Sequence, residues 1–375
     1  MSKKIIICLN TAWNIYNFRT GLIRALVAQG YEVVAVAPYD EYVPLLNGLG
    51  CRFVNFPIDN QGTNPWRDFL LLWRFWKLLR REGPLAYLGF TVKPNIYGSL
   101  VAHAIGIPVI NNIAGLGAAF KKNGWLRWFV TTLYRLALRK SKKVFFQNSD
   151  DQKMFIESGL VQKSCAALLP GSGIDLEHFS SRVRVVNFGG DRSRRFQFLL
   201  HARMLWDKGV GEYVEAARLL RGNGQEVDFL LMGFLNVPNP AAIPESVMNA
   251  WVSEGCIKFI ESTADVRKAI AEADCIVLPS YREGIPRSLL EAAAMAKPII
   301  TTDVSGCRDV VTDGVNGFLC KVGDAEDLAR CLERMVSLDP ASRVAMGVAG
   351  RLKMEQHFDE RIVFAKYIDA LGSIL

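Results

Sequence analysis

Short apolar runs alternate with helix-like segments along the chain. In the first half these strand-like runs lie at 5–9, 33–38, 53–57, 85–91, 108–113, 144–148 and 167–170. The second half repeats the pattern at 196–202, 229–233, 257–260, 275–279, 298–302 and 318–322. Strands that alternate with helices form βαβ units, in which helices cover both faces of a parallel sheet. The pattern therefore predicts two doubly wound α/β domains.

A polar stretch at 182–195 separates the two series of runs. A chain of 375 residues also has the length of two domains. We therefore expect one domain at 1–190 and a second at 191–375. Ligands of such sheets bind at the carboxyl ends of the strands, so two facing sheets predict a cleft for the ligand.

Charge is distributed unevenly between the two halves. Residues 1–190 carry 23 Lys or Arg against 11 Asp or Glu, whereas residues 191–375 carry 22 against 26. The excess lies within 66–143, which holds 14 basic and 2 acidic side chains. This asymmetry predicts an anionic partner for the N-terminal half.

Two segments in the N-terminal half combine basic residues with tryptophan. Residues 66–81 have the pattern of one helix, with the basic side chains on one arc and an apolar arc wider than a core-facing helix needs. A similar segment follows at 125–143. This composition is typical of helices that lie on an anionic membrane surface. A buried helix with a basic outer edge is the alternative, and the absence of RNA- and DNA-binding motifs argues against a nucleic-acid partner.

Several other classes of site find no support in the sequence. The eight cysteines are scattered without a Cys-x-x-Cys pair, and the four histidines lack ligand spacing, so we expect reduced core cysteines and no metal. Glycine-rich dinucleotide and P-loop motifs are missing, and we expect no cofactor. With neither a signal peptide nor an apolar run of about 18 residues, the chain is expected to stay in the cytoplasm.

The strongest chemical motif lies after the run at 275–279. Glu283 and Glu291 flank a predicted strand-to-helix turn formed by Gly284, Ile285, Pro286 and Arg287. Proline is well tolerated at a helix start, and the free amides and dipole of a helix N-terminus attract anions. An anion site between two carboxylates suits a ligand that is part phosphate and part polyol, such as a nucleotide sugar.

Two cations follow the first strand of the second half, Arg203 and Lys208. The Asp-x-Asp clamp that holds a metal-diphosphate complex is missing from the sequence, so another cation must meet a diphosphate. Arginine binds phosphate oxygens in a bidentate manner, and lysine acts as a point charge. A solvated loop with ordinary surface cations is the alternative.

Together, Arg203, the pair Lys208-Gly209 and the Glu283-to-Glu291 motif resemble the retaining GT-B glycosyltransferases of family 4. The flanking segments 278–284, 296–300 and 313–318 are similar to this family as well, and 171–175 resembles the segment that ends its N-terminal domain. The resemblance covers the whole chain and is strongest in the second half.

This resemblance implies a GT-B fold and a donor site in the domain 191–375. Arg203 and Lys208 would hold the donor diphosphate, and Glu283 would contact the sugar and stabilise the transition state. Glu291 would bind the ribose hydroxyls, and the backbone at Gly284, Ile285, Pro286 and Arg287 would meet phosphate or sugar. Gly233 is assigned to the donor site in the same way. The resemblance favours a UDP-sugar donor, a metal-independent reaction and a last helix, about 359–375, that packs back on the N-terminal domain.

The acceptor side departs from the common family pattern. A Gly-Gly turn after the first strand and a histidine after the fourth are absent, and the corresponding segments carry Asn14, Arg19 and Lys93. These side chains could meet a phosphorylated acceptor. The local pattern resembles the subgroup that extends polyprenyl-diphosphate-linked sugars, which implies such an acceptor and a location on the inner face of the cell membrane.

The sequence thus predicts retaining transfer of an N-acetylhexosamine or hexose from a UDP-sugar to a lipid-linked saccharide in surface polysaccharide or glycan synthesis. A nucleotide-sugar epimerase of the same fold is one alternative. A non-catalytic membrane-associated subunit is another, although it would have no reason to keep Arg203, Lys208, Glu283 and Glu291 together.

Overall fold

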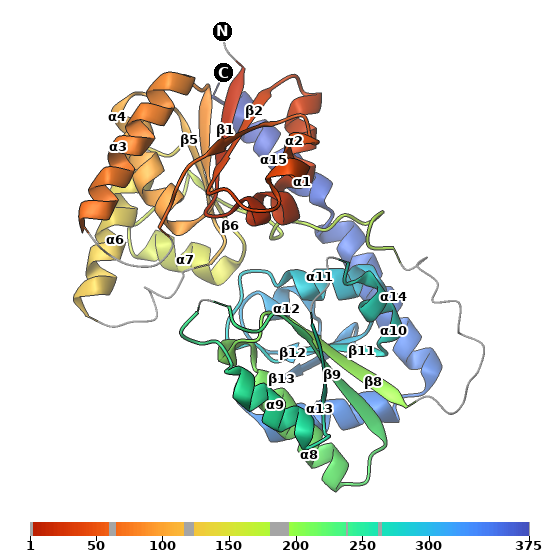
Figure 1. Cartoon of the computed structure of the whole chain (residues 1–375). Coiled ribbons are helices and arrows are strands. Elements are labelled where there is room, and N and C mark those ends of the chain that lie inside the picture. The colour runs from red at the N-terminus through yellow and green to blue at the C-terminus, as the bar shows by residue number, and fades with distance from the viewer. Residues whose placement is uncertain are drawn as a thin grey trace. The chain divides into compact units, whose positions relative to one another are not determined.

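The computed structural model describes residues 3–59, 65–115, 124–180, 195–237, 239–261 and 265–374. Contacts within the chain divide it into two compact units, which are considered one at a time (Figure 1). The first unit comprises Met1–Ser172 together with Glu360–Leu375, and the second comprises Gly173–Asp359.

The strands described in the first unit form one parallel sheet in the order β3-β2-β1-β4-β5-β6-β7. These strands are β1 (Lys4–Cys8), β2 (Glu32–Ala37), β3 (Arg52–Asn55), β4 (Ala86–Gly89), β5 (Val109–Ile113), β6 (Lys143–Phe146) and β7 (Ala166–Leu168). The helices are α1 (Ala12–Ala28), α2 (Val43–Asn47), α3 (Pro65–Glu82), the π-helix η1 (Pro94–Gly98), α4 (Ser99–Ala104), α6 (Trp125–Leu138), α7 (Ser149–Glu157) and α15 (Glu360–Gly372).

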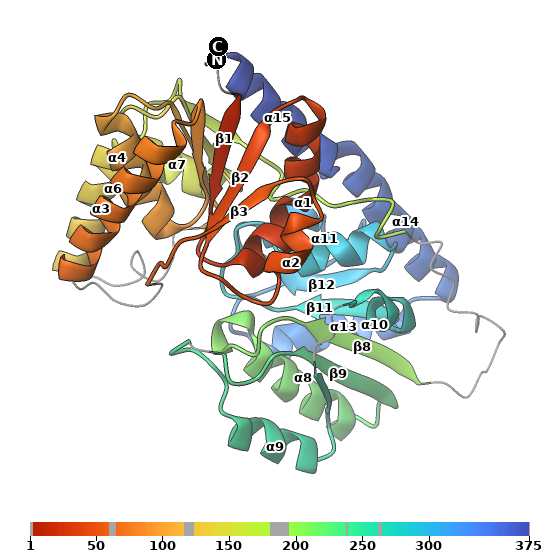
Figure 2. The ribbon, with the colours of Figure 1, turned by 45° about the horizontal axis from the view of Figure 1, so that its top comes forward.

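Strand β1 explains why these runs are apolar throughout and do not alternate with polar residues. Ile5 and Ile7 belong to the core that contains side chains of α1 and α15. Ile6 and Cys8 point to the opposite face, into the core that contains side chains of α3, α4 and α6. Figures 1 and 2 show these two groups of helices on opposite faces of the sheet. Ile5, Ile6, Ile7 and Cys8 are all buried, as expected for a parallel sheet covered on both sides.

The second unit contains another parallel sheet, with its described strands in the order β10-β9-β8-β11-β12-β13. They are β8 (Phe196–His201), β9 (Val227–Gly233), β10 (Lys258–Glu261), β11 (Cys275–Leu278), β12 (Ile299–Thr302) and β13 (Gly317–Cys320). The helices are the 3-10 turn η2 (Trp206–Lys208), α8 (Val210–Gly222), α9 (Glu245–Ser253), α10 (Arg267–Glu272), α11 (Arg287–Ala294), α12 (Cys307–Val310), α13 (Ala325–Ser337) and α14 (Pro340–His357).

The predicted strand-like runs are confirmed, since each coincides with an observed strand. The helix predicted at 66–81 is also confirmed as α3. The prediction of one basic segment at 125–143 is only partly right, because α6 ends at Leu138. The backbone amide of Lys142 already donates to the carbonyl of Val109 at 2.9 Å, and β6 begins at Lys143. Pairing with β5 therefore ends the helical segment before its last basic residues.

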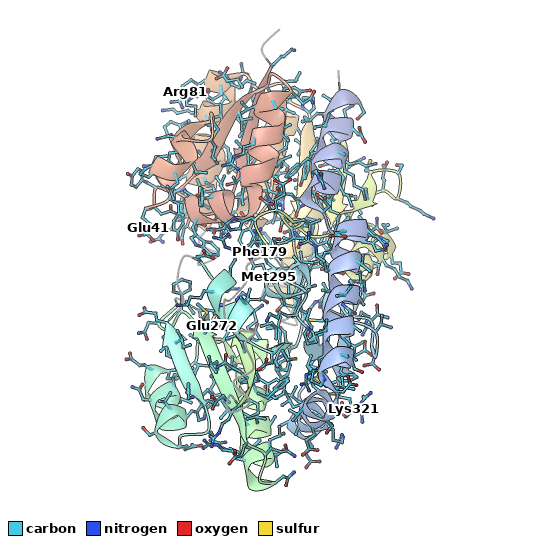
Figure 3. All side chains as sticks on the ribbon, turned by 90° about the vertical axis from the view of Figure 1, so that its right-hand side faces the viewer. Glu41, Arg81, Phe179, Glu272, Met295 and Lys321 are labelled. Carbon is cyan, nitrogen blue, oxygen red and sulfur yellow. The ribbon has the colours of Figure 1, made fainter. Side chains whose placement is uncertain are left out.

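The first unit ends before the polar stretch that suggested a boundary at 190. Residues 173–180 belong to the second unit. The Arg351 guanidinium on α14 explains this, because its Nη1 donates to the carbonyl oxygens of Leu176 at 3.2 Å and Phe179 at 2.8 Å. Phe179, which is labelled in Figure 3, also belongs to the core of the second unit. Residues 181–194 lie outside the described residues.

The last helix, α15, completes the core of the first unit. Its buried side chains Val363, Tyr367, Ala370 and Leu371 join the core that contains α1. Figures 1 and 2 show α15 on the same face of the sheet as α1. The Asn112 amide donates to the Tyr367 hydroxyl at 3.0 Å. Burial raises the pKa of Tyr367 to about 12, so the hydroxyl stays neutral at physiological pH. The Tyr367 ring therefore belongs to the packed interior of the first unit.

Replacing Tyr367 should separate its packing from its hydrogen bond. Tyr367→Ala should lower the free energy of unfolding by about 3–5 kcal/mol, because it leaves a cavity in the core. Tyr367→Phe should cost about 1 kcal/mol, because it removes only the acceptor for Asn112. Unfolding in urea measures both, with the neighbouring exposed variant Lys366→Ala as a control. Equal stability of Tyr367→Ala and the control would contradict a structural role for α15.

Candidate active site

The candidate site of the second unit lies at the point where the strand order of its sheet reverses, between β8 and β11. The chain proceeds from β8 through β9 to β10 on one side and then returns to place β11 on the other side of β8. In doubly wound sheets this switch point, at the carboxyl ends of the strands, is where ligands bind. The loop after β8 carries Arg203 and Lys208, and the loop after β11 carries Glu283. The fold thus brings the two predicted motifs to one edge of one sheet.

Direct hydrogen bonds join these two loops. The carbonyl oxygen of Asp207 accepts from the backbone amide of Tyr281 at 3.0 Å and from the Ser280 hydroxyl at 3.1 Å. Gly209 follows with a positive φ of 72°, and a Cβ at this position would overlap the carbonyl oxygen of Pro279. The glycine after Lys208 is therefore required both by its backbone conformation and by the close approach of the second loop.

Lys208 and Glu283 form an ion pair at the centre of this arrangement. The Lys208 ammonium donates to Glu283 Oε1, and the Ser280 hydroxyl donates to the same oxygen at 2.7 Å. The Lys208 and Glu283 side chains are 17% and 11% exposed, respectively, so water screens their charges little. The sequence predicted both residues for one site without indicating that they touch. Their contact fixes the orientation of the carboxylate and of the ammonium.

Glu291 is held by two basic side chains, one of which the sequence analysis missed. Arg287, one turn earlier on α11, donates from Nε to Glu291 Oε1 at 2.9 Å. His201 Nε2 lies 3.2 Å from Glu291 Oε2. Burial alone would raise the pKa of the Glu291 carboxyl, but the adjacent His201 and the charge of Arg287 outweigh it and lower that pKa. His201 is the last residue of β8, and its place at the carboxyl end of a strand-like run is the sequence signal that could have identified it.

The other predicted donor residues surround this centre. Arg203 is exposed immediately after β8, and Pro286 caps the start of α11 while Gly284 and Ile285 form the preceding loop. Gly233 ends β9, where a Cβ would overlap the carbonyl oxygen of Ala202. Packing between β8 and β9 is therefore one reason for a glycine at this position, and donor contacts by these residues stay a prediction.

Strand β12 and the turn after it support the loop after β11, which carries Glu283 and is called here the glutamate loop. The Thr301 hydroxyl donates to the carbonyl oxygen of Leu278 at 2.6 Å, and the Thr302 hydroxyl donates to that of Ser280. Gly306 has a φ of 81°, and a Cβ there would overlap the carbonyl oxygen of Gly284. These three residues are absent from the predicted site because they act through backbone contacts that short motifs do not reveal.

The predicted acceptor residues occupy different environments in the first unit. The Asn14 backbone amide donates to Thr11 at 3.0 Å, and its side chain donates to Asn10 at 2.8 Å. Arg19 is 4% exposed, with its guanidinium carbon 4.5 Å from the centre of the Phe90 ring. Arg19 thus packs within the first unit and is not a surface cation there. Contact of these residues with an acceptor stays a prediction.

Lys93, the third predicted acceptor residue, follows β4 and makes a partly buried ion pair. Its ammonium donates to Asp68 Oδ1 on α3 at 2.8 Å. The Tyr97 hydroxyl donates to the other oxygen of Asp68 at 2.7 Å. Asp68 thereby fixes Lys93 between η1 and α3.

Helix α3 has apolar side chains on two opposite sides. Leu71, Phe75, Leu78 and Leu79 are buried in the core of the first unit. The other side is called here the aromatic face. Its side chains recur every three or four residues and remain exposed, and that of Trp66 is 79% exposed. The aromatic face consists of Trp66, Phe69, Leu70, Trp73 and Trp76. A helix that only packs against the core would need apolar side chains on the first, buried side alone.

Basic side chains accompany the aromatic face. The Lys77 ammonium lies 3.6 Å from the centre of the Trp73 ring, and the Arg80 guanidinium carbon lies 5.4 Å from that of Trp76. Helix α6, on the same side of the sheet (Figures 1 and 2), exposes Trp128, which is 70% exposed, and Leu136. In the part of the chain that the structure describes, no helix has the length and apolar character needed to cross a bilayer.

The described residues contain no cluster of three or more His, Cys, Asp or Glu side chains with the geometry of a metal site. All eight cysteines are free, and Cys165 alone among them is not buried. Burial raises the pKa of the Cys8 thiol to about 12. These cysteines therefore behave as apolar core residues.

Comparison with known families matches both units. A family described as glycosyl transferase 4-like domain matches residues 18–171, and glycosyl transferases group 1 matches residues 195–337. The chain belongs to the group 1 glycosyltransferases. The family predicted from Arg203, Lys208, Glu283 and Glu291 is thus confirmed.

Relatives that match most of the chain are glycosyltransferases, and a solved structure shares its fold. An N,N'-diacetylbacillosaminyl-diphospho-undecaprenol alpha-1,3-N-acetylgalactosaminyltransferase of Campylobacter jejuni is 26% identical, over 96% of each chain. A UDP-Gal:alpha-D-GlcNAc-diphosphoundecaprenol alpha-1,3-galactosyltransferase of Escherichia coli is 23% identical, over 72% of this chain and 70% of the relative. The Anabaena protein HepE, solved with UDP-glucose, has a TM-score of 0.79 and 18% identity over 99% of each chain. The predicted GT-B fold, with two doubly wound domains, is confirmed.

Substituting Gly306 should disturb the glutamate loop of this glycosyltransferase. Gly306→Ala should cost about 2–4 kcal/mol of unfolding free energy, because backbone strain adds to overlap with the carbonyl of Gly284. Gly314 has a similar φ of 72° but open space around it, so Gly314→Ala should cost only about 1 kcal/mol. Urea unfolding of both variants measures the difference. Equal losses would show that the close approach to Gly284 is unimportant.

Proposed function

We propose that this glycosyltransferase moves a sugar from a UDP-sugar to a polyprenyl-diphosphate-linked saccharide, with retention at the anomeric carbon and without a metal. The observation that carries the proposal is the Lys208–Glu283 pair beside Glu291 at the switch point of the second sheet. It combines a fixed cation for a phosphate with carboxylates for a sugar and a ribose. The names of the Campylobacter and Escherichia relatives, which specify diphospho-undecaprenol acceptors, support the acceptor class.

The donor's leaving group determines the role of the cations. Breaking the bond between a sugar and UDP leaves new negative charge on the diphosphate. Lys208 and Arg203 supply positive charge at the carboxyl ends of the strands, where that charge develops, and hydrogen bonds between ionised groups are the stronger kind. These side chains thus take the part that a metal ion has in other sugar transferases.

The two glutamates have different tasks in this mechanism. Glu291 is held in its ionised form by His201 and Arg287, which suits acceptance of hydrogen bonds from ribose hydroxyls. Glu283 is oriented by Lys208 and Ser280 and contacts the sugar, where a carboxylate stabilises oxocarbenium-like charge. Retention follows if the acceptor hydroxyl attacks from the face that the diphosphate leaves, with the departing phosphate accepting its proton.

The acceptor side of the proposal rests on the first unit. A lipid-linked saccharide presents its diphosphate at the membrane surface, so the enzyme has to work there. The aromatic face of α3 provides apolar anchors, and Lys77 and Arg80 beside it suit anionic headgroups. Peripheral association with the cytoplasmic face of the cell membrane through α3 and α6 is therefore part of the proposal.

Substitution of the central ion pair tests the catalytic assignment. Glu283→Gln and Lys208→Met should each lower kcat/KM for transfer by about 100- to 1000-fold, because each removes charge that stabilises the transition state. Transfer from UDP-sugars to a polyprenyl-diphosphate-linked sugar is the measurement. The exposed variant Lys268→Met on α10 is the charge-matched control, and unfolding in urea verifies that the variants fold. Activity within twofold of the parent in either variant would refute the assignment.

Vesicle binding tests the membrane surface. Lys77→Ala combined with Arg80→Ala should weaken binding to anionic vesicles about tenfold or more, since each basic residue contributes about 1 kcal/mol near such a surface. Cosedimentation with anionic and neutral phospholipid vesicles measures the effect, which high salt should abolish. The pair Lys258→Ala and Lys268→Ala removes the same charge from the second unit and should have little effect. Equal binding of the parent to neutral and anionic vesicles would contradict the role of charge.

A further inference from the structure

A hollow of about 310 Å³ lies beside α3 in the first unit, close to the aromatic face. Its lining includes Pro57, Asp59, Arg67, Leu70, Arg74 and Lys93. Leu70 belongs both to this lining and to the aromatic face, so the two features are continuous. The hollow therefore lies at the edge of an exposed apolar surface, and its lining combines apolar side chains with charged ones.

Three cations reach the hollow from two parts of the fold. Arg67 and Arg74 stand two turns apart on α3, about 10 Å along the helix axis. Lys93 comes from the segment after β4, where Asp68 and Tyr97 fix it. Arg74 Nη1 donates to the carbonyl oxygen of Pro57 at 3.3 Å, which directs its guanidinium toward the chain after β3.

The ion pairs around the hollow differ in how readily a ligand could replace them. Arg67 donates to Asp59 at 2.7 Å, but the Arg67 side chain is 67% exposed and that of Asp59 is 30% exposed. Such exposed pairs contribute little to stability, and an anionic ligand can displace the carboxylate. The Lys93–Asp68 pair is 16% and 14% exposed and remains as a fixed support. An incoming anion would thus form paired hydrogen bonds with the guanidinium groups of Arg67 and Arg74, and Lys93 would act as a point charge.

We propose that this hollow binds the diphosphate group of a polyprenyl-diphosphate-linked acceptor. The forked guanidinium groups of Arg67 and Arg74 suit its paired phosphate oxygens, and Lys93, which stays paired with Asp68, adds a further donor. The aromatic face beside the hollow accommodates the membrane surface from which the lipid chain extends. This inference rests on the proposed function, because it assigns the acceptor's anchoring site to residues of α3 and to Lys93.

Direct binding of a soluble acceptor distinguishes this hollow from general attraction to a basic helix. The probe is a short-chain prenyl diphosphate linked to a sugar, titrated calorimetrically without vesicles. Arg74→Ala should raise the Kd about tenfold or more, equivalent to one lost charge-assisted hydrogen bond. Arg80→Ala, on the same helix but outside the hollow, should stay within twofold. Arg74→Lys should recover part of the affinity, because it restores the charge without the fork.

Two further measurements distinguish the diphosphate of the acceptor from a phospholipid headgroup as the ligand of the hollow. Inorganic pyrophosphate should compete with the probe, whereas vesicles of ordinary anionic phospholipid should bind Arg74→Ala as well as the parent and Arg80→Ala more weakly. Equal losses of probe affinity in those two variants would overturn the proposal in favour of nonspecific attraction. Preferential loss of binding to polyprenol-free vesicles in Arg74→Ala would overturn it in favour of a phospholipid headgroup.

Transfer assays separate failure of this inference from failure of the proposed function. If the parent transfers sugar to the lipid-linked acceptor and Arg74→Ala keeps its KM, the hollow is not the acceptor site, although the function stands. If the parent transfers to no diphosphate-linked acceptor, the proposed function fails. UDP binding by Arg74→Ala, which should equal that of the parent, verifies that the second unit is intact.

Discussion

The parallel pairing of β8 with β11 is the constraint on which the candidate site depends. It brings together Lys208 and Glu283, which are 75 residues apart in the sequence. Close packing maintains this arrangement, because Gly209 lies against the carbonyl of Pro279 and Gly306 lies against that of Gly284. The loops are thereby fixed by backbone contacts, and the charged side chains project from a rigid base. Such preorganisation lets fixed charges act on a reaction without the cost of reorienting them.

The same winding serves two chemical tasks in the two units. In the second unit, the loops after β8 and β11 carry opposite charges in contact, together with a buried and ionised Glu291. In the first unit, the equivalent edge carries Asn14 and Lys93, while α3 provides a broad exposed surface of tryptophan and basic residues. One architecture therefore supports a compact polar site in one unit and an extended amphipathic surface in the other.

The strands, α3 and the charged residues of the second unit could be predicted from the sequence because each depends on local patterns. Buried parallel strands are continuous apolar runs, and motif spacing follows from the βα unit. The partners of these residues could not be predicted in the same way. The contact of His201 with Glu291 and the burial of Arg19 against Phe90 depend on which strands are neighbours. The end of α6 at Leu138 likewise reflects pairing of the following chain with β5.

The packing of α15 has a consequence for the order in which the protein folds during synthesis. The second unit is continuous in the sequence, from Gly173 to Asp359, and all of it leaves the ribosome before α15 does. The first unit is synthesised first but lacks Tyr367 and Leu371 in its core until the C-terminal helix emerges. Domains generally form in order from the N-terminus. Here the N-terminal unit reaches its complete core only after its C-terminal neighbour has been synthesised and α15 has followed it.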